Sequence, residues 1–353
     1  MAFFGNDAVN RVNLHYGVQA VAMNAGGVFW LAFLLHAGVP VPLTLLSFAG
    51  VLAGRFALRP LMLPLGKGFG LKPLVITGAV IMAAQYPMLA EVRGLNVWLF
   101  VLCATASVAD VVYWPAFHAY FAALGDPEHR GHQIAAREAI GAVVGIAAPL
   151  LGAWAIVTAG PRIAFAGVAV VQALSALPLV GAPNVAVPRN APSALRTAQL
   201  GIGLFITDGW VAASFYFIWQ IALFISLGRS LTGYGGAMAL AALVGAGVGL
   251  LFGRHIDRGH GRRAVLIAYG VLAAVSALRA ISVGSPWLAV TANVLGPLVG
   301  ALLLPAEMTA VYNAAKASPC PFRFHIASEG GWDVGCGCGL LIAAGLSALG
   351  LSL

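Results

Sequence analysis

The sequence predicts an all-α, polytopic membrane protein. Of its 353 residues, 61% are hydrophobic and the mean hydropathy is +0.93, well above the composition of soluble domains, which are roughly 45–50% apolar. Only 8% of the residues are Asp, Glu, Lys or Arg, and most of these lie at the ends of apolar runs. The runs are continuously apolar and do not alternate with a period of two, so they indicate membrane helices and not a β-barrel.

Eleven apolar segments have the length of a membrane span. A helix needs about 20 apolar residues to cross the hydrocarbon core, and Gly, Pro and charged residues divide the chain at that spacing. We expect spans at 14–37, 40–65, 73–91, 95–123, 134–159, 162–182, 202–227, 232–256, 264–283, 286–315 and 333–352. The first segment exceeds the roughly 7–15 residue core of a cleaved signal peptide, so we expect it to remain as a span.

The basic residues predict the orientation of these spans. If the N-terminus is cytoplasmic, fifteen of the nineteen Lys and Arg residues fall on the inner side, and only Arg93, Arg162, Arg229 and Arg279 fall outside. Such an excess is typical of cytoplasmic loops, so we expect a cytoplasmic (inner) membrane protein with its N-terminus inside. The net charge of +8 then reflects topology, and no nucleic-acid partner is expected.

The chain contains a duplication of about 190 residues. The stretch GRHIDRGHGRRAVL at 253–266 repeats GKGFGLKPLVI at 66–76 with an offset of 191, and the same offset relates Glu329 to Glu138. We therefore expect a six-helix half at 1–183, a cytoplasmic connector at 184–201 and a second half at 202–353 with five helices. By this arithmetic the twelfth helix is missing.

The repeated loop resembles the signature of the major facilitator superfamily of transporters. The second copy carries Gly253, Asp257, Arg258, Gly261, Arg262 and Arg263, with one additional residue before Gly261. In the first copy Gly66 replaces the acid. The resemblance implies two pseudo-symmetric six-helix bundles, about eleven helices of which are present here, and secondary transport of a small molecule across a bacterial inner membrane.

A gate follows from this resemblance. The pseudo-symmetry places the 253–263 loop at the start of the fifth helix, near Arg137 and Glu138, so that Asp257 would fasten the two halves together on the inside. In the other loop, Lys67 or Lys72 is expected to pair with Glu329 or Asp333. The alternative is an ordinary basic loop on the cytoplasmic side, which accounts for the arginines but not for Asp257.

The fourth span carries the strongest candidate for a proton site. An ionisable group inside a span is energetically unfavourable and is therefore a functional candidate. Asp110, Trp114, Phe117 and Phe121 share one predicted helical face, and Tyr113 and His118 lie beside it. Asp110 could take up a proton in a cavity for an apolar or cationic substrate, or it could be buried against an Arg or Asn of a partner helix.

The seventh span repeats this pattern. Asp208, Ala212, Phe215 and Trp219 share a predicted face, with Tyr216 and Gln220 adjoining. Helices 1, 4, 7 and 10 surround the central cavity in the family, and the resemblance therefore adds Gln19, Asn24, Asn293 and Glu307 to the candidates. Arg55 and Arg59 are expected to lie too near the cytoplasmic end of the second helix to contribute.

These residues predict an apolar, cationic or amphipathic substrate. The piece Ala148, Pro149, Gly152, Ala153 is similar to an element of proton-coupled antiporters in the superfamily, and it favours antiport slightly over symport. A transport-inactive scaffold or sensor is the alternative.

The sequence lacks the motifs that are typical of pumps, enzymes and metal-binding proteins. The sequence has no phosphate-binding loop, HExxH or Gly-x-Ser-x-Gly motif, so neither a pump nor an enzyme is expected. No cofactor is expected, and the residues that could bind metal do not have the spacing of a metal site. These residues are Cys103, Cys320, Cys336, Cys338, His255, Asp257 and His260.

Overall fold

The computed structural model describes residues 5–126, 129–256 and 261–351. Within these ranges it describes only the backbone at residues 130–132, 135, 138, 248–256, 261–265, 301–306 and 309. Every statement below refers to this part of the chain.

The described residues form eleven long helical segments and one short helix, α10. The first half of the chain contains α1 (Asp7–Ala25) continued by η2 (Gly27–Phe29) and α2 (Trp30–His36), α3 (Val41–Leu58) continued by η3 (Arg59–Leu61) and α4 (Met62–Phe69), α5 (Leu71–Ala90), α6 (Val97–Leu124), α7 (Arg130–Thr158), and α8 (Pro161–Leu174) followed by α9 (Leu177–Val180). The second half contains the short α10 (Ala194–Thr197), α11 (Gln199–Ala212) continued by the π-helix η4 (Ala213–Ile218) and α12 (Trp219–Ser226), α13 (Leu231–Ile256), α14 (Gly261–Ser282), α15 (Pro286–Ala317) and α16 (Pro321–Ala348). The predicted all-helical class is confirmed.

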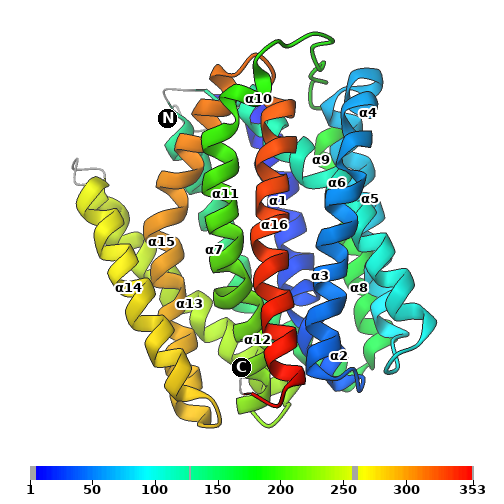
Figure 1. Ribbon diagram of the computed structural model, residues 1–353, viewed down its shortest axis with the longest axis vertical. Helices are drawn as coiled ribbons and strands as arrows, with labels where there is room; N and C mark the ends of the chain where they lie inside the picture. Colours follow the sequence, from blue (N-terminus) through cyan, green and yellow to red (C-terminus); the bar gives the residue numbers. More distant parts are fainter. Residues whose placement is uncertain (1–4, 127–128, 257–260, 352–353) are drawn as a thin grey trace.

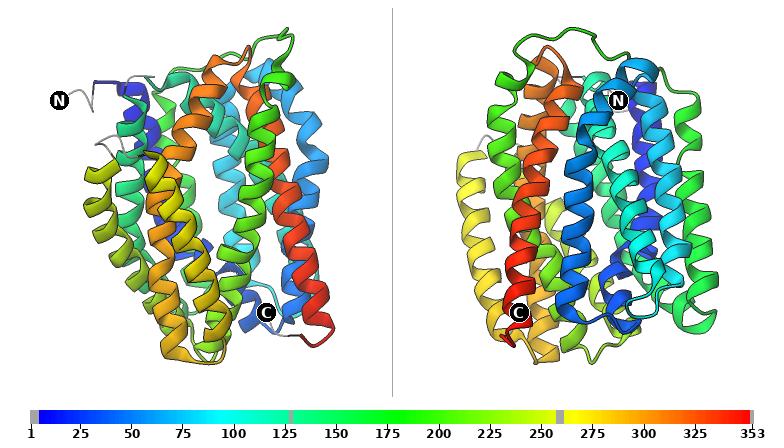
Figure 2. Two further views of the ribbon diagram at one scale, coloured as in Figure 1. Left: turned by 60° about the vertical axis from the view of Figure 1, so that its left-hand side comes forward. Right: turned by 45° about the vertical axis from the view of Figure 1, so that its right-hand side comes forward.

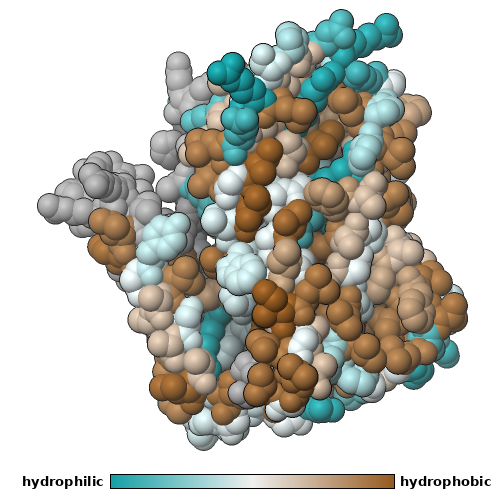
Figure 3. Space-filling model, viewed as in Figure 1, coloured by the Kyte–Doolittle hydropathy of each residue, from teal (hydrophilic) through white to brown (hydrophobic). Residues whose placement is uncertain are grey.

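The long helices run side by side along one axis (Figures 1 and 2). Eight helical segments are long and apolar enough to cross a membrane, and three shorter apolar stretches lie at Leu231–Gly247, Leu266–Ser282 and Pro286–Gly300. Apolar side chains cover most of the face in Figure 3, and hydrophilic ones gather at its upper end. The chain is a multi-pass integral membrane protein.

We call the end of the bundle that holds α4 and α10 the connector end (Figure 1).

The helices follow the spacing of the sequence repeat. Helices α11, α13, α14, α15 and α16 begin 189 to 192 residues after α1, α3, α5, α6 and α7, in that order. The two groups of helices meet most extensively where α3 packs against α16 and α7 packs against α13. The division into halves at residues 183 and 202 stays a prediction.

Two helices begin earlier than predicted. Helix α1 begins at Asp7 and not near residue 14, because the side chain of Asn6 caps it by accepting from the amide of Val9. Helix α16 begins at Pro321 and not at residue 333. The polar residues of its first turns made this stretch look too hydrophilic for a span, but the structure buries Glu329 and His325 against other helices.

Glycines allow α16 to approach α11 closely. A methyl group added at Gly335 would lie 2.0 Å from the carbonyl oxygen of Ile206, and one at Gly209 would lie 2.4 Å from the carbonyl oxygen of Trp332. Small residues at a crossing point are a common basis of helix association in membranes, where no hydrophobic effect drives the contact. The backbones of α11 and α16 therefore pack against each other without intervening side chains.

We predict that Gly335→Ala destabilises the protein by about 1–3 kcal/mol, the usual cost of overpacking a close contact. The added methyl group meets backbone, which cannot move away as a flexible side chain would. Gly337→Ala is the matched control, since it lies in the same helix and no atom lies within 4 Å of the added methyl. Thermal unfolding in detergent compares the two variants, and equal midpoints would contradict this account of the crossing.

Candidate functional site

A cavity of about 600 Å³ lies where the two groups of helices meet. Both groups contribute to its walls. Its polar lining residues are Gln19, Asn24, Arg55, Gln85, Asp110, His118, Gln172, Asp208, Gln220, Glu307 and Glu329. Its aromatic lining residues are Trp30, Phe48, Tyr86, Trp114, Phe205, Phe217 and Trp332.

Eight of the candidates predicted from the sequence line this cavity: Gln19, Asn24, Asp110, Trp114, His118, Asp208, Gln220 and Glu307. The other three, Tyr113, Trp219 and Asn293, do not. Tyr113 is buried within the first group of helices, where its hydroxyl donates to Gln19 and lies 2.8 Å from His15 Nε2. The indole N–H of Trp219 donates to Asn293 Oδ1 at 3.0 Å.

The face of α6 that lines the cavity differs from the predicted one. Asp110, Trp114 and His118, spaced four residues apart, line the cavity, whereas Phe117 and Phe121 are fully buried in the packing between helices. Periodicity alone identified an aromatic stripe, but aromatic side chains also fill helix contacts. The polar residues at this spacing mark the cavity face.

A π-helix changes the face of the seventh helical segment. Asp208 and Phe217 line the cavity, whereas Phe215 and Trp219, which were expected to share the face of Asp208, pack against Arg279 at 3.8 and 4.5 Å from their ring centres. A π-turn holds more residues than an α-turn, so the predicted register is wrong beyond residue 212. Arg279 Nη1 donates to the carbonyl oxygen of Phe215 within this turn, at 2.5 Å.

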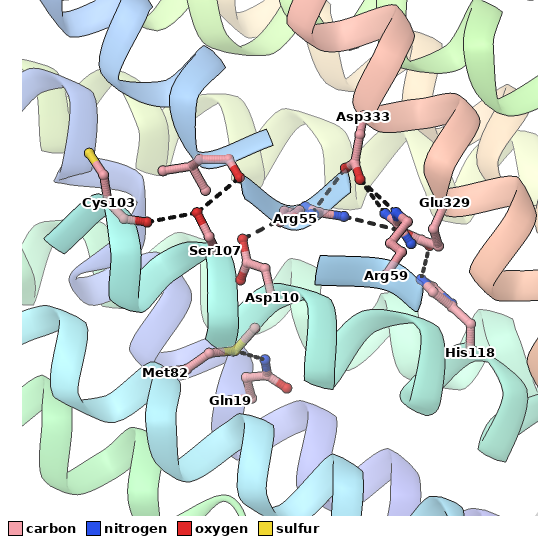
Figure 4. Close-up of polar contacts among 11 residues, drawn as sticks. Gln19, Arg55, Arg59, Met82, Cys103, Ser107, Asp110, His118, Glu329 and Asp333 are labelled. Atoms are coloured by element: carbon pink, nitrogen blue, oxygen red, sulfur yellow. Dashed lines mark hydrogen bonds and ion pairs between the residues drawn. The ribbon is translucent and has the colours of Figure 1, made fainter. Parts of the chain in front are cut away.

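Arg55 of α3 and Arg59 of η3 form ion pairs with acids of α16 across the two groups of helices (Figure 4). Arg59 Nη2 lies 2.5 Å from Asp333 Oδ2, Arg55 Nε lies 3.0 Å from Asp333 Oδ1, and Arg55 Nη2 lies 3.2 Å from Glu329 Oε2. On the cavity side, Arg55 Nη1 lies 3.7 Å from Asp110 Oδ2. We call these five residues the ion network.

The ion network replaces the predicted pairing of Lys67 or Lys72 with Glu329 or Asp333, which is wrong. Lys67 is exposed, and Lys72 Nζ donates to the carbonyl oxygens of Val180 and Ala182. The expectation that Arg55 and Arg59 lie too near the helix end is also wrong. Helix α3 continues through η3 and α4 to Phe69, so both arginines lie well inside the segment.

The ion network is almost completely buried and carries unequal charge. The side chains of Arg55, Arg59, Glu329 and Asp333 are 1–6% exposed, and that of Asp110 is 20% exposed. Three carboxylates therefore face two guanidinium groups. Charges removed from water need partners of opposite sign, so this network has one acid more than its arginines can neutralise.

His118 connects the ion network to the connector side of the cavity. Its Nε2 lies 3.4 Å from Glu329 Oε1, and its Nδ1 lies 2.6 Å from the hydroxyl of Tyr312. Arg137 Nη1 donates to the same hydroxyl at 3.2 Å. His325 stacks on His118 at 5.5 Å between ring centres. Helices α6 and α7 thus contact α15 and α16 through polar side chains.

A second contact between the two groups lies at the connector end. Lys316 Nζ, at the end of α15, donates to the carbonyl oxygen of Gly125 after α6 at 2.6 Å. A cation near a helix C-terminus is favourable because the last carbonyl groups carry partial negative charge. The neighbouring Asp126 accepts from the amides of Asn6 and Gln133, and these hydrogen bonds lower the pKa of its carboxyl group.

Aromatic residues connect the two groups on the other side of the cavity. The ring of Phe48 packs on Phe217 at 4.3 Å between centres. Phe29 and Tyr234 meet at 5.7 Å, and the hydroxyl of Tyr234 donates to the carbonyl oxygen of Val28. Contacts between the groups therefore lie on both sides of the cavity along the bundle axis.

The predicted gating motif falls largely outside the described residues. Asp257 and Arg258 are outside them, and only the backbone is described at Gly253, Gly261, Arg262, Arg263 and Glu138. Arg137 is buried and contacts Tyr312 of α15.

We predict that Arg59→Gln destabilises the protein by about 3 kcal/mol, the lower end of the range for breaking a buried ion pair, because Asp333 keeps Arg55 as a partner. Arg59→Gln combined with Asp333→Asn should recover part of this loss, since both buried charges are then absent. Arg162→Gln breaks an exposed pair with Glu91 and should change stability far less, because water solvates both charges. Denaturation in detergent measures all three, and equal losses for Arg59→Gln and Arg162→Gln would contradict the importance of burial.

Known structures share this arrangement of helices. The crystal structure of the human organic anion transporter MFSD10 (TETRAN) superposes with a TM-score of 0.68 over 97% of this chain and 94% of the other, at 17% identity. The E. coli fucose:proton symporter FucP superposes with a TM-score of 0.66 at 15% identity, covering 97% and 92% of the two chains. A FucP structure in the outward conformation gives a TM-score of 0.64 at 16% identity, with the same coverage. At these identities the likeness concerns the fold.

The sequence itself matches a family model. No curated protein matched the chain, but the model described as Major Facilitator Superfamily matches residues 16–320. This match covers most of the sequence and agrees with the fold. The chain therefore belongs to the Major Facilitator Superfamily, whose members are membrane transporters rather than enzymes.

Proposed function

We propose that this chain is a proton-coupled secondary transporter that moves a small cationic or amphipathic solute with an apolar body across the cytoplasmic membrane by alternating access. The observation that carries the proposal is the composition of the central cavity. Four carboxylates line it, those of Asp110, Asp208, Glu307 and Glu329, against the guanidinium of Arg55 among the described lining residues. Seven aromatic side chains complete the wall.

This lining favours a cation over other solutes. A positive solute is attracted to the carboxylates and to the faces of aromatic rings, and aromatic walls also remove apolar surface from water. Asp208 is held in place by the indole N–H of Trp332, which donates to its Oδ2 at 3.0 Å. A carboxylate and an aromatic ring are thus presented together on one wall.

The lining argues against an anionic solute. The human protein that shares the fold is described as an organic anion transporter. In the present cavity, an organic anion would face four carboxylates and would find one lining arginine, which already contacts Asp110 and Glu329. The anion specificity of that structural neighbour is therefore not proposed for this chain.

Asp110 is the proposed site where solute and proton compete. It lines the cavity and lies 3.7 Å from Arg55, so it is accessible to a solute and also belongs to the ion network. A proton on Asp110 removes the charge that would bind a cationic solute, which favours exchange of one for the other. This competition, together with the Ala148–Ala153 element in α7, favours antiport over the symport described for FucP.

We place the connector end in the cytoplasm. Lys67, Lys72 and Arg196 lie at this end, and Arg93, Arg162 and Arg229 lie near the other. The excess of basic residues in the loops on the connector side is the pattern of cytoplasmic loops.

We predict that a lipophilic cation stabilises the purified protein and that an anion of the same shape does not. Tetraphenylphosphonium should raise the thermal midpoint, since a ligand at about 100 times its dissociation constant contributes about 2.7 kcal/mol. Tetraphenylborate, matched in size and opposite in charge, is the control. The shift for the cation should shrink as the pH falls, because protons compete for the same carboxylates. Equal shifts for both ions would contradict charge selection by the cavity.

We predict that Asp110→Asn abolishes proton-driven transport of tetraphenylphosphonium in proteoliposomes while leaving the free energy of unfolding of the empty protein within about 1 kcal/mol of wild type. The amide cannot exchange a proton, so an imposed pH gradient no longer drives the cycle. Asp7→Asn is the control, because Asp7 is exposed and pairs only locally with Arg11. A wild-type protein that binds the cation but never moves it would favour a transport-inactive scaffold or sensor.

A further inference from the structure

We infer that His118 and Glu329 form a second proton site, distinct from Asp110, and that a proton bound there holds the connector end of the transporter closed. The inference deepens the proposed function, because it names the residues through which proton binding would control access from the cytoplasm. Glu329 also belongs to the carboxylates that line the cavity, whereas His118 takes no part in the charge selection argued above.

The ion network has one more negative than positive charge, and this imbalance favours the binding of a proton. Asp110, Glu329 and Asp333 face Arg55 and Arg59 in a site that is nearly closed to water. One further positive charge makes the network neutral. Among the described residues, His118 is the titratable base in direct contact with these acids, through Nε2 at 3.4 Å from Glu329 Oε1.

The groups that face His118 come from four helices. Glu329 and His325 approach from α16, Tyr312 from α15, Arg137 from α7 and Arg55 from α3. Burial of the ring, and then the two arginines, oppose a positive charge on His118, and Glu329 favours it. Since Glu329 makes the direct contact and can accept a hydrogen bond from the charged ring, we expect the acid to determine whether the proton binds.

The geometry couples this proton to the contact between the halves. A doubly protonated imidazole is a donor at both nitrogens, so Nε2–H donates to Glu329 and Nδ1–H donates to the oxygen of Tyr312. Both acceptors belong to the second group of helices, whereas His118 belongs to the first. The proton comes from water in the cavity, which both His118 and Glu329 line. When the proton leaves, the neutral imidazole of His118 binds Glu329 less strongly across the interface.

Cys320 provides a native reporter of the connector end. It lies directly before α16, is fully buried and is a free thiol. It packs in a cluster with residues of α1, α4 and α6 from the other group of helices. Separation of the two groups at this end would therefore expose Cys320, and its rate of alkylation measures how often that happens. Glutathione alkylated in the same buffer reports the intrinsic reactivity of a thiol in water at each pH.

The test compares alkylation of Cys320 by N-ethylmaleimide in full-length wild type and His118→Gln, resolved by peptide mass spectrometry and divided by the rate for glutathione. At about pH 5, where a histidine can be charged, Cys320 should react roughly 10-fold to 100-fold faster in His118→Gln, the factor that corresponds to losing a hydrogen bond between charged groups. At about pH 8 the two proteins should react alike. Equal rates in both proteins at both pH values would overturn the inference.

Two further variants locate the proton. Glu329→Gln removes the excess acid, so Cys320 reactivity should lose its dependence on pH, as in His118→Gln. His325→Gln is the matched control, because His325 stacks on His118 and is fully buried, but neither of its ring nitrogens has a hydrogen-bond partner among the described residues. It should keep the wild-type pH dependence. Loss of the dependence in His325→Gln but not in His118→Gln would assign the proton to the other imidazole and overturn the proposal.

The result of the alkylation experiment does not depend on whether the chain transports a solute. Alkylation needs no solute and no gradient, so a pH-dependent closure that requires His118 can be found even if the protein moves no lipophilic cation. Conversely, proton-driven transport that survives His118→Gln, with unchanged Cys320 reactivity, would leave the transporter proposal intact and eliminate this site.

Discussion

The structure depends on one set of buried charges, the pairing of Arg55 in α3 and Arg59 in η3 with Glu329 and Asp333 in α16. In a membrane these groups have no water to solvate them, and each would be strongly destabilising without its partner. Because the partners come from opposite groups of helices, the charges are satisfied only when the two groups meet in this register. The same pairing places acids at the wall of the cavity.

Packing around the ion network allows the helices to reach that register. Glycines of α16 bring its backbone against α11, and α16 lies between α11 and α3 (Figure 1). Small residues of α7 serve the same purpose elsewhere, since a methyl group at Gly152 would lie 2.0 Å from the carbonyl oxygen of Ala25. Close backbone contacts fix the helices laterally, and the charges then fix their depth relative to one another.

Irregular turns decide which side chains reach the cavity. The π-helix at Ala213–Ile218 directs Phe217 and Gln220 to the cavity and turns Trp219 toward Asn293. In the first segment, α1 ends at Ala25 and a 3₁₀ turn follows, near the cavity-lining Asn24. A cavity between otherwise regular helices thus takes its lining from turns whose hydrogen bonds are not those of an α-helix.

The sequence by itself determined the class, the eleven helices, the repeat spacing and eight of the cavity-lining residues, including Asp110, His118 and Asp208. Helix length, hydropathy and the rarity of charge within a span are local properties, so they can be read along the chain. The roles of Arg55, Arg59, Glu329 and Asp333 were decided only by the tertiary structure. Near a predicted helix end, a charged residue is ordinarily solvated, and only a partner 274 residues away makes its burial favourable. The face of the seventh segment was likewise decided by a π-turn that periodicity does not reveal, because an α-helical period assumes an unbroken hydrogen-bond pattern.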